Sequence, residues 1–211
     1  MISQEPRAFY IENFLSTIEA EHIISICKDK IKQSGVGEPS TGVFSSSTRT
    51  SKNTWLRRQY SPLIESVFKR GSDLLQLDDR LLYPERSVVI DENGDKLHHI
   101  VEDLQVVHYG IGEKYDTHHD WGVSGYPESR YLTLLLYLTD QEDENSGGET
   151  SFPKAADGKG IKIVPKKGSA AMFYSVLPDG NGDDLSAHAS LPVHRGEKWL
   201  ANMWVWDSSR R

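Results

Sequence analysis

The sequence has little cysteine and no long apolar segment. Cys27 is the single cysteine among 211 residues, which excludes an intrachain disulfide. No run approaches the roughly 18 apolar residues that span a bilayer, and the first ten residues lack the apolar core of a signal peptide. These absences predict no membrane contact and favour a cytoplasmic location, because nothing requires an oxidising compartment. The apolar positions around Cys27 indicate that it packs in a helix.

Positive charge is also scarce. Lys and Arg number 24 against 31 Asp and Glu, a formal net charge of −7. Because a nucleic-acid-binding domain usually carries a basic patch, we expect no nucleic-acid partner. Hydrophobic residues make up 37% and charged residues 26%, as in ordinary globular proteins. At about 150 residues per domain, the length predicts one domain. Nothing in these counts determines the oligomeric state.

Helical signals lie in the N-terminal part, about residues 1–85. Ser16 and Glu19 have the spacing of a capping box, and apolar residues follow on one helical face up to a stop expected near Gly35. A second helix is expected to begin with Pro62 in its first turn, and Gly71 is expected to break it.

Two segments between these helices and the C-terminal half predict loops and turns. Residues 35–53 are rich in Gly, Ser and Thr, and we expect a long mobile loop there. Asn93-Gly94 lies between residues 87–90 and 96–101, a strong signal for a hairpin.

The C-terminal half, about residues 103–207, predicts strands separated by glycine-rich turns. Helices followed by strands argue against an alternating α/β fold, and many short strands favour a sandwich or barrel. The predicted strands are residues 104–109, 114–119, 131–139, 161–164, 169–174, 191–194 and 198–206.

A His-x-Asp pattern is the first chemical signal. His118 and Asp120 lie two apart on a predicted strand end, so both side chains face one side while His119 faces the other. His188 precedes a later strand and is a candidate third ligand. Two imidazoles and one carboxylate on one face of a metal leave three positions open, as in non-haem Fe(II) oxygenases. By itself the pattern is weak, and ordinary surface histidines are the alternative.

A lysine on an otherwise buried strand is the second signal. Strand alternation over residues 198–206 places Lys198, Leu200, Asn202, Trp204 and Trp206 on one face. A buried, unpaired lysine is unfavourable, and a dicarboxylate ligand would remove that penalty. The alternative is a lysine whose charged end reaches solvent at the strand end.

These residues occur in blocks that resemble the prolyl 4-hydroxylases, a family of Fe(II)- and 2-oxoglutarate-dependent dioxygenases. The resemblance extends from Arg7 to Asp207. Residues 49–51 and 54–56 match the family's flexible segment on the substrate side. The core blocks are 104–109 (LQVVHY), 112–120 (GEKYDTHHD), 147–153 (GGETSFP), 168–173 (GSAAMF) and 188–199 (HASLPVHRGEKW).

The resemblance implies one catalytic domain over residues 1–211. Its expected fold is mainly β, with a double-stranded β-helix core (a cupin-like jelly roll) and the N-terminal helices packed on one sheet. The implied iron ligands are His118, Asp120 and His188. Lys198 is implied as the partner of the distal carboxylate of 2-oxoglutarate. The other implied residues of the cosubstrate pocket are Thr150, Tyr109 and Trp204.

The resemblance also implies the reaction and its partners. The reaction is hydroxylation of peptidyl proline at C4, with decarboxylation of 2-oxoglutarate to succinate. It needs Fe(II), O₂ and 2-oxoglutarate, with ascorbate as a reductant. The expected partner is a proline-rich peptide or protein. Substrate-side positions are Tyr115, Arg130, Arg49 and Trp55.

Two other readings stay open at this point. One is a related oxygenase that acts on free proline, on a non-proline protein residue or on a ribosome-associated protein. The other is a cupin-like binding protein without turnover, which predicts a broken ligand set or a missing anion partner. The presence of His118, Asp120, His188 and Lys198 together argues against the second.

Overall fold

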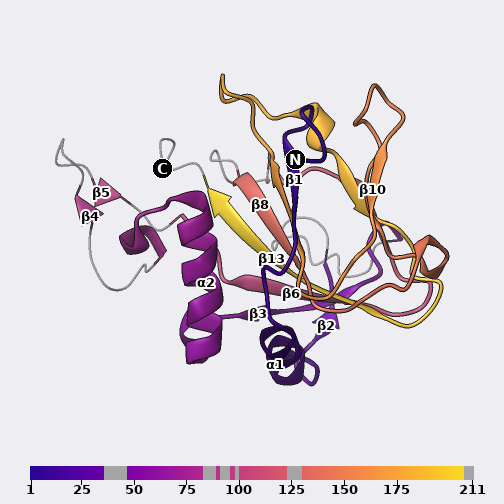
Figure 1. The fold of residues 1–211 in the computed structure, drawn as a ribbon, viewed down its shortest axis with the longest axis horizontal. Coiled ribbons are helices and arrows are strands. Elements are labelled where there is room, and N and C mark those ends of the chain that lie inside the picture. The colour runs from indigo at the N-terminus through magenta and orange to yellow at the C-terminus, as the bar shows by residue number, and fades with distance from the viewer. Residues whose placement is uncertain (36–46, 83–88, 91–95, 98–99, 123–129, 207–211) are drawn as a thin grey trace.

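Two antiparallel sheets form the body of the protein (Figure 1). The computed structural model describes residues 1–35, 47–82, 89–90, 96–97, 100–122 and 130–206. The major sheet has seven strands, in the order β1 (Ala8–Ile11), β11 (Ala170–Tyr174), β8 (Arg130–Tyr137), β13 (Lys198–Trp206), β6 (Leu104–Tyr109), β3 (Lys52–Leu56) and β2 (Lys32–Gln33).

A smaller sheet faces the major one. Its four strands are β10 (Ile161–Ile163), β9 (Thr150–Phe152), β12 (His188–Ser190) and β7 (Tyr115–His118). A separate hairpin pairs β4 (Val89–Ile90) with β5 (Lys96–Leu97). This confirms the expected hairpin strands, while its turn lies outside the described residues. Short 3-10 turns are η1 (Arg58–Tyr60), η2 (Asp79–Leu82), η3 (Glu144–Ser146) and η4 (Asp184–Ser186).

Helix α1 (Thr17–Cys27) begins as predicted. The Ser16 hydroxyl accepts a hydrogen bond from the Glu19 amide, and the Glu19 carboxylate accepts one from the Ser16 amide. The helix ends at Cys27 rather than near Gly35, because the chain turns there and enters the edge strand β2. Cys27 is buried, as the helical pattern indicated.

Helix α2 (Pro62–Leu75) corrects the expected break at Gly71. The helix continues through this residue and packs it against β13. A Cβ atom at Gly71 would lie 2.7 Å from the sulfur of Met203, so glycine allows the helix to approach the sheet closely. Close packing, rather than helix termination, therefore explains this glycine.

Apolar residues gather in two layers, one on each face of the major sheet. Both helices cover one face, where Ile23 and Phe68 meet β8 and β13 residues such as Leu134 and Met203. The other face meets the small sheet, where Tyr137, Phe152 and Phe173 pack together. This arrangement is the expected jelly-roll core with helices on one sheet. A cavity lies in the second layer, between the two sheets.

Six of the seven strands predicted in the C-terminal half are confirmed within one or two residues: β6, β7, β8, β10, β11 and β13. Strands β6 and β13 have the predicted limits. The strand expected at residues 191–194 is wrong. The strand at this point is β12, which ends at Ser190, because Pro192 has no backbone N–H to donate to a neighbouring strand. Sequence analysis missed four strands, which are short and lack clear alternation: β1, β2, β3 and β9.

The loop expected at residues 35–53 is partly a paired segment. Residues 36–46 lie outside the described residues. Arg49 forms a β-bridge with Tyr115, and strand β3 begins at Lys52, where it pairs with β6. The segment therefore crosses from the small sheet to the major sheet and borders the space between them.

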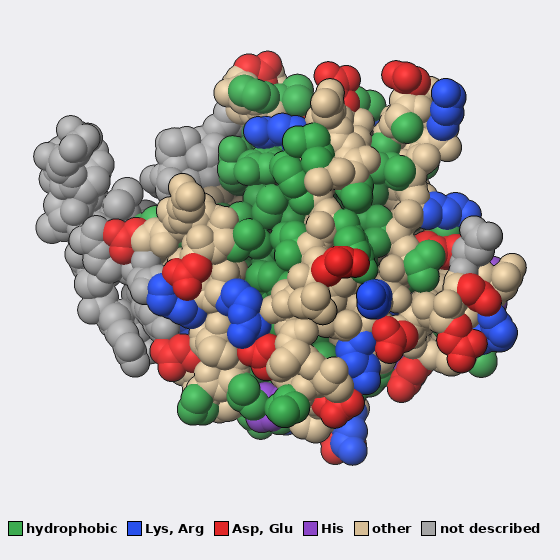
Figure 2. All heavy atoms as spheres, in the orientation of Figure 1, with side chains coloured by type: hydrophobic (Ala, Val, Ile, Leu, Met, Phe, Trp, Pro, Cys, Tyr) green, Lys and Arg blue, Asp and Glu red, His purple; other side chains and the backbone are tan. Residues whose placement is uncertain are grey.

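One face of the molecule carries an apolar area. Figure 2 shows hydrophobic side chains gathered over β1, ringed by charged ones. A shallow groove there is lined by Ile2, Tyr10 and residues 161–164. Among the described helices, none is long and apolar enough to cross a membrane.

Candidate active site

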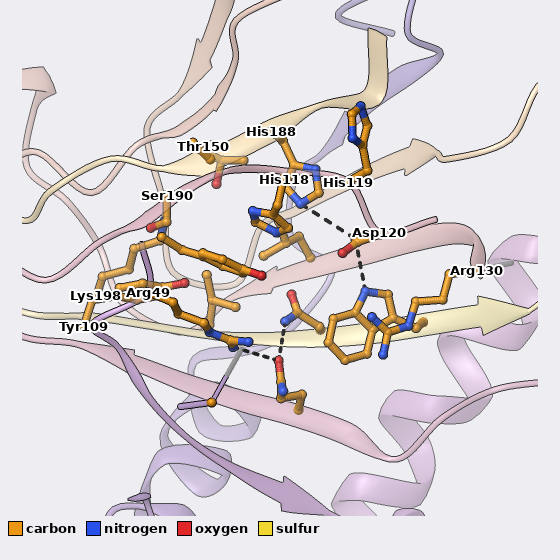
Figure 3. Close-up of a pocket in the computed structure, with 18 residues that line it drawn as sticks. Arg49, Tyr109, His118, His119, Asp120, Arg130, Thr150, His188, Ser190 and Lys198 are labelled. Carbon is orange, nitrogen blue, oxygen red and sulfur yellow. Dashed lines mark hydrogen bonds and ion pairs between the residues drawn. The ribbon is translucent and has the colours of Figure 1, made fainter. Parts of the chain in front are cut away.

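A cavity of about 290 Å³ lies between the two sheets. Its lining side chains are drawn in Figure 3. His118, His188 and Asp120 lie toward one end, and Lys198, Tyr109 and Ser190 lie toward the other. The His-x-Asp pattern and the buried lysine, which the sequence singled out separately, therefore lie in one cavity.

Strand pairing brings the two histidines together. His118 closes β7 and His188 opens β12, and the two residues are directly opposite each other in the antiparallel pair. Asp120 follows two residues after His118. One ligand atom from each of the three residues lies within 4.8 Å of the others, a spacing that a metal ion can bridge. His119 points away from this cluster, as expected (Figure 3).

Both imidazoles present the same nitrogen to the cluster. Nδ1 of His118 is 2.8 Å from the carbonyl oxygen of Asp116, and Nδ1 of His188 is 3.0 Å from that of Ser186. If each Nδ1 donates to its carbonyl, each Nε2 keeps a lone pair for a metal. Burial and the neighbouring His188 lower the pKa of His118 to about 3, so its ring is neutral near pH 7.

Asp120 supplies the negative charge. It is buried, and its Oδ2 accepts hydrogen bonds from the Thr133 hydroxyl at 2.6 Å and from the Trp204 indole at 3.1 Å. Burial alone would raise the pKa of Asp120, but the two histidines, Arg130 and Thr133 outweigh it and lower the pKa to about 2. Two imidazoles and an ionised carboxylate are a donor set that fits Fe(II).

Lys198 occupies the other end and is fully buried. Its Nζ donates to the Ser190 hydroxyl at 2.8 Å. Burial lowers the pKa of Lys198 to about 7, and the charge of Glu149 opposes this shift only in part. No carboxylate of the described part of the chain forms an ion pair with it. This end therefore fits an anionic ligand group, as the sequence predicted.

Hydroxyl groups surround the lysine. The Tyr137 hydroxyl donates to Thr150 Oγ1 at 2.8 Å, which leaves the Thr150 proton available for a ligand in the cavity. Tyr109 also lines the cavity; burial raises the pKa of its phenol, which hydrogen-bonds to Ser190 and Ser51. Sequence analysis missed Ser190, although it lies two residues after His188 on the same strand and its side chain therefore faces the same way.

The residues expected on the substrate side lie around the metal end. The Tyr115 ring stacks on His118, with centroids 3.6 Å apart, and the Arg49 guanidinium lies 4.5 Å from the Tyr115 ring centroid. Arg49 also donates to Gln105, which sequence analysis missed. Trp55 is 49% exposed and does not line the cavity, but its ring lies 5.9 Å from that of Trp204, which does.

Four of the five residues expected on one face of β13 line the cavity: Lys198, Leu200, Asn202 and Trp204. Trp206 does not line it. Its ring packs with the helix-side layer and lies 5.7 Å from the Arg130 guanidinium carbon. The pairing of β13 with β8 shifts at this point, since Val205 is opposite Leu132 and Trp206 is opposite Arg130.

Comparison with known proteins agrees with this geometry. Residues 104–206 match the model of the 2OG-Fe(II) oxygenase superfamily. Probable prolyl 4-hydroxylase 8 of Arabidopsis thaliana is 34% identical over 97% of this chain and 70% of its own length. Prolyl 4-hydroxylase subunit alpha-1 of Gallus gallus is 30% identical over 95% of this chain and 36% of its own length.

Solved structures are similar over nearly the whole chain. The viral collagen prolyl hydroxylase vCPH from Paramecium Bursaria Chlorella virus-1, solved as a 2OG complex, is 28% identical, with a TM-score of 0.69 over 98% of this chain and 99% of that one. A Pseudomonas putida prolyl-4-hydroxylase shares the fold at 18% identity, with a TM-score of 0.63 over 97% of this chain and 92% of that one.

The fold and site define a 2-oxoglutarate- and Fe(II)-dependent oxygenase. Within that class, the identity to curated relatives places the chain in the prolyl 4-hydroxylase family.

Proposed function

We propose that this protein hydroxylates proline residues of a peptide or protein at C4, with 2-oxoglutarate as cosubstrate. One observation carries the proposal: a single cavity contains the His118–Asp120–His188 cluster at one end and the buried Lys198 at the other. One end of such a dicarboxylate cosubstrate would bind the metal. Its far carboxylate would need a cation to pair with. Membership of the family supports the same reaction.

The proposed roles follow from the contacts. His118, Asp120 and His188 would hold Fe(II). Lys198 would donate to the distal carboxylate of 2-oxoglutarate. The hydroxyls of Thr150 and Tyr109 would assist it, and Trp204 would close the wall beside Asp120. With these residues on strands of both sheets, residues 1–211 would act as one catalytic domain.

Iron held by His118, Asp120 and His188 would supply the oxygen chemistry that couples proline hydroxylation to the decarboxylation of 2-oxoglutarate to succinate and CO₂. The chain's own part is to orient the cosubstrate, to direct Nε2 of both histidines toward the metal through their Nδ1 contacts and to exclude water. Ascorbate would keep the iron reduced between cycles.

The substrate is proposed to lie over the metal end. Tyr115 and Arg49 present flat faces there, and Arg130 and Trp55 flank Trp204. Flat faces suit the rings of a proline-rich peptide, which is pre-ordered as polyproline II. The sheet edges and the segment at residues 47–51 border this region.

Mass spectrometry of a proline-rich peptide mixture tests the proposal. The enzyme is incubated with Fe(II), ascorbate and 2-oxoglutarate. We expect a gain of one oxygen on proline that requires 2-oxoglutarate, with one succinate formed for each hydroxyl group. Fragmentation against a 4-hydroxyproline standard establishes the position. An Asp120→Ala variant, treated identically, is the matched control.

Other outcomes separate the alternatives. Succinate without peptide oxidation would retain the oxygenase and reject a proline peptide as its substrate. An absence of both products from an iron-loaded protein would overturn catalysis and favour a cupin-like binding protein.

A further inference from the structure

Two donors converge on one oxygen of Asp120. The Thr133 hydroxyl and the Trp204 indole both donate to Oδ2, at 2.6 and 3.1 Å. Thr133 on β8 and Trp204 on β13 are direct partners in the major sheet. A single cross-strand pair of the major sheet therefore holds a carboxylate that lies two residues beyond the end of β7, a strand of the small sheet.

A cation lies on the far side of this contact. The Arg130 guanidinium carbon is 3.5 Å from the ring centroid of Trp204. Arg130 Nε and Nη2 donate to the two Glu102 oxygens at 2.7 and 3.1 Å, which fixes the guanidinium plane. Both side chains are largely buried, with exposed fractions of 16% for Arg130 and 20% for Glu102.

Trp206 completes the arrangement. The Arg130 guanidinium carbon also lies 5.7 Å from the ring centroid of Trp206. The Trp206 indole donates to Glu102 Oε1 at 2.7 Å, while the Trp204 indole donates to Asp120. Two indoles of one strand thus hold the two acidic side chains at the ends of a single chain of contacts, Glu102–Arg130–Trp204–Asp120.

We propose that Arg130 is a positioning residue for the metal-binding carboxylate and acts on Asp120 through the Trp204 indole. The inference rests on the proposed function, because it takes Asp120 as an iron ligand. A cation held against an indole face fixes the ring and draws electron density from it, which makes the ring N–H a stronger donor. The strengthened hydrogen bond restricts the rotation of the carboxylate and keeps it aimed at His188 Nε2, 3.7 Å away.

Positioning by Arg130 and a direct effect of its charge predict opposite changes in metal affinity when Arg130 is removed. Arg130 is a positive charge near a divalent-cation site, so Coulomb repulsion alone predicts that its removal tightens metal binding. Positioning predicts the opposite, because a ligand that loses its outer hydrogen-bond support binds metal about 10- to 100-fold more weakly. A role confined to the substrate predicts an altered KM for the peptide and an unchanged metal Kd.

The test is a double-mutant cycle with the metal alone as probe. Calorimetric titration with Co(II), without 2-oxoglutarate, gives the metal Kd of the full chain. We expect Trp204→Phe, which keeps a ring and loses the N–H, to weaken Co(II) binding about tenfold. We expect Arg130→Met to weaken it severalfold in the wild-type chain and to have no further effect beside Trp204→Phe.

Two controls isolate the path through the indole. Thr133→Val removes the other donor to Asp120 Oδ2 but keeps the Trp204 indole, so Arg130→Met should still weaken Co(II) binding in that background, unlike in Trp204→Phe. Arg195→Met removes an exposed arginine paired with Asp143 and should leave the Co(II) Kd unchanged. Thermal melting of each variant shows that it is folded.

Each remaining outcome decides against the inference. An unchanged or tighter Co(II) Kd in Arg130→Met would overturn it, and so would an equal loss in the wild-type and Trp204→Phe chains. If such a result came with a wild-type chain that binds Co(II) and hydroxylates peptide, this inference would fail and the proposed function would stand. If the wild-type chain bound no Co(II), the proposed function would fail with it.

Discussion

The two ends of the cavity are built in different ways. The metal end combines an acid with hydrogen-bond partners already in place: Asp120 accepts from Thr133 and Trp204, and both histidines contact backbone carbonyls. The far end holds Lys198 fully buried, with a neutral hydroxyl as its hydrogen-bond partner. The first end is organised before a ligand arrives, whereas the second is unfavourable until an anion binds.

The largest effect is expected at the metal end. His118→Ala removes one of three ligand atoms and should lower coupled turnover more than about 10³-fold, equivalent to about 4 kcal/mol. The adjacent His119→Ala is the matched control, since His119 points away from the cluster (Figure 3). Succinate and hydroxyproline are measured together. Turnover of His118→Ala within tenfold of wild type would contradict the assigned site.

Substitution of Lys198 should separate the two ends. Lys198→Met keeps the volume and removes the charge, so we expect the KM for 2-oxoglutarate to rise about 100-fold, the loss of a charge-assisted contact worth about 3 kcal/mol. The Co(II) Kd should stay within about twofold of wild type. Lys69→Met, an exposed lysine on α2, is the control. Equal losses in metal and cosubstrate affinity would mean that the two ends are not independent.

The same lysine predicts a pH dependence. Burial holds the pKa of Lys198 at about 7 in the folded chain, below the ordinary lysine value of 10.5. A dicarboxylate prefers the protonated amine, so the Kd for 2-oxoglutarate should rise with pH above about 7, approaching tenfold per unit. Direct binding titrations check this. A flat profile in wild type, or an identical profile in Lys198→Met, would contradict it.

Folding stability should respond to this pKa with a defined sign. Between pH 7 and 10.5 the unfolded chain binds more protons at Lys198 than the folded chain does, so this group makes stability rise with pH across that window. Below pH 7 its unfavourable contribution is present in full. Urea unfolding at several pH values should show the slope in the difference between wild type and Lys198→Met. Parallel curves would reject the shifted pKa.

The smallest effect is expected at Thr150. Thr150→Val removes the proposed cosubstrate donor and leaves the buried Tyr137 hydroxyl without its acceptor. We expect a KM for 2-oxoglutarate several-fold higher and a stability loss of about 1–2 kcal/mol. Tyr137→Phe keeps the Thr150 hydroxyl and should reproduce part of the stability loss without the change in KM. If both variants altered KM equally, Thr150 would be only a packing residue.

Sequence reasoning was strongest where the argument was local. The separation of two residues between His118 and Asp120, and the alternation along β13 from Lys198 to Trp204, depend only on the geometry of one strand. It was weaker where several segments combine. Nothing along the chain connects Thr133 to Asp120, or Glu102 to Arg130, because these contacts arise when strands of different origin pair.

Short strands show the same limit. Thr150 was identified through the family resemblance, but β9, which carries it into the cavity, gave no strand signal in only three residues. Arg49 was placed on the substrate side, while the surrounding segment was expected to be a loop and instead bridges to Tyr115. In both cases pairing with a neighbour stabilises a strand that its own residues do not specify.

The sequence by itself determined the chemical groups of this oxygenase, the strand faces that carry most of them and the family to which they belong. Tertiary structure decided which groups meet: the pairing of β7 with β12 that joins His118 to His188, and the contacts of Trp204 with Asp120 and of Trp206 with Glu102. The physical reason is range. Side-chain alternation is a property of consecutive residues, whereas strand pairing and register depend on residues far apart in the chain.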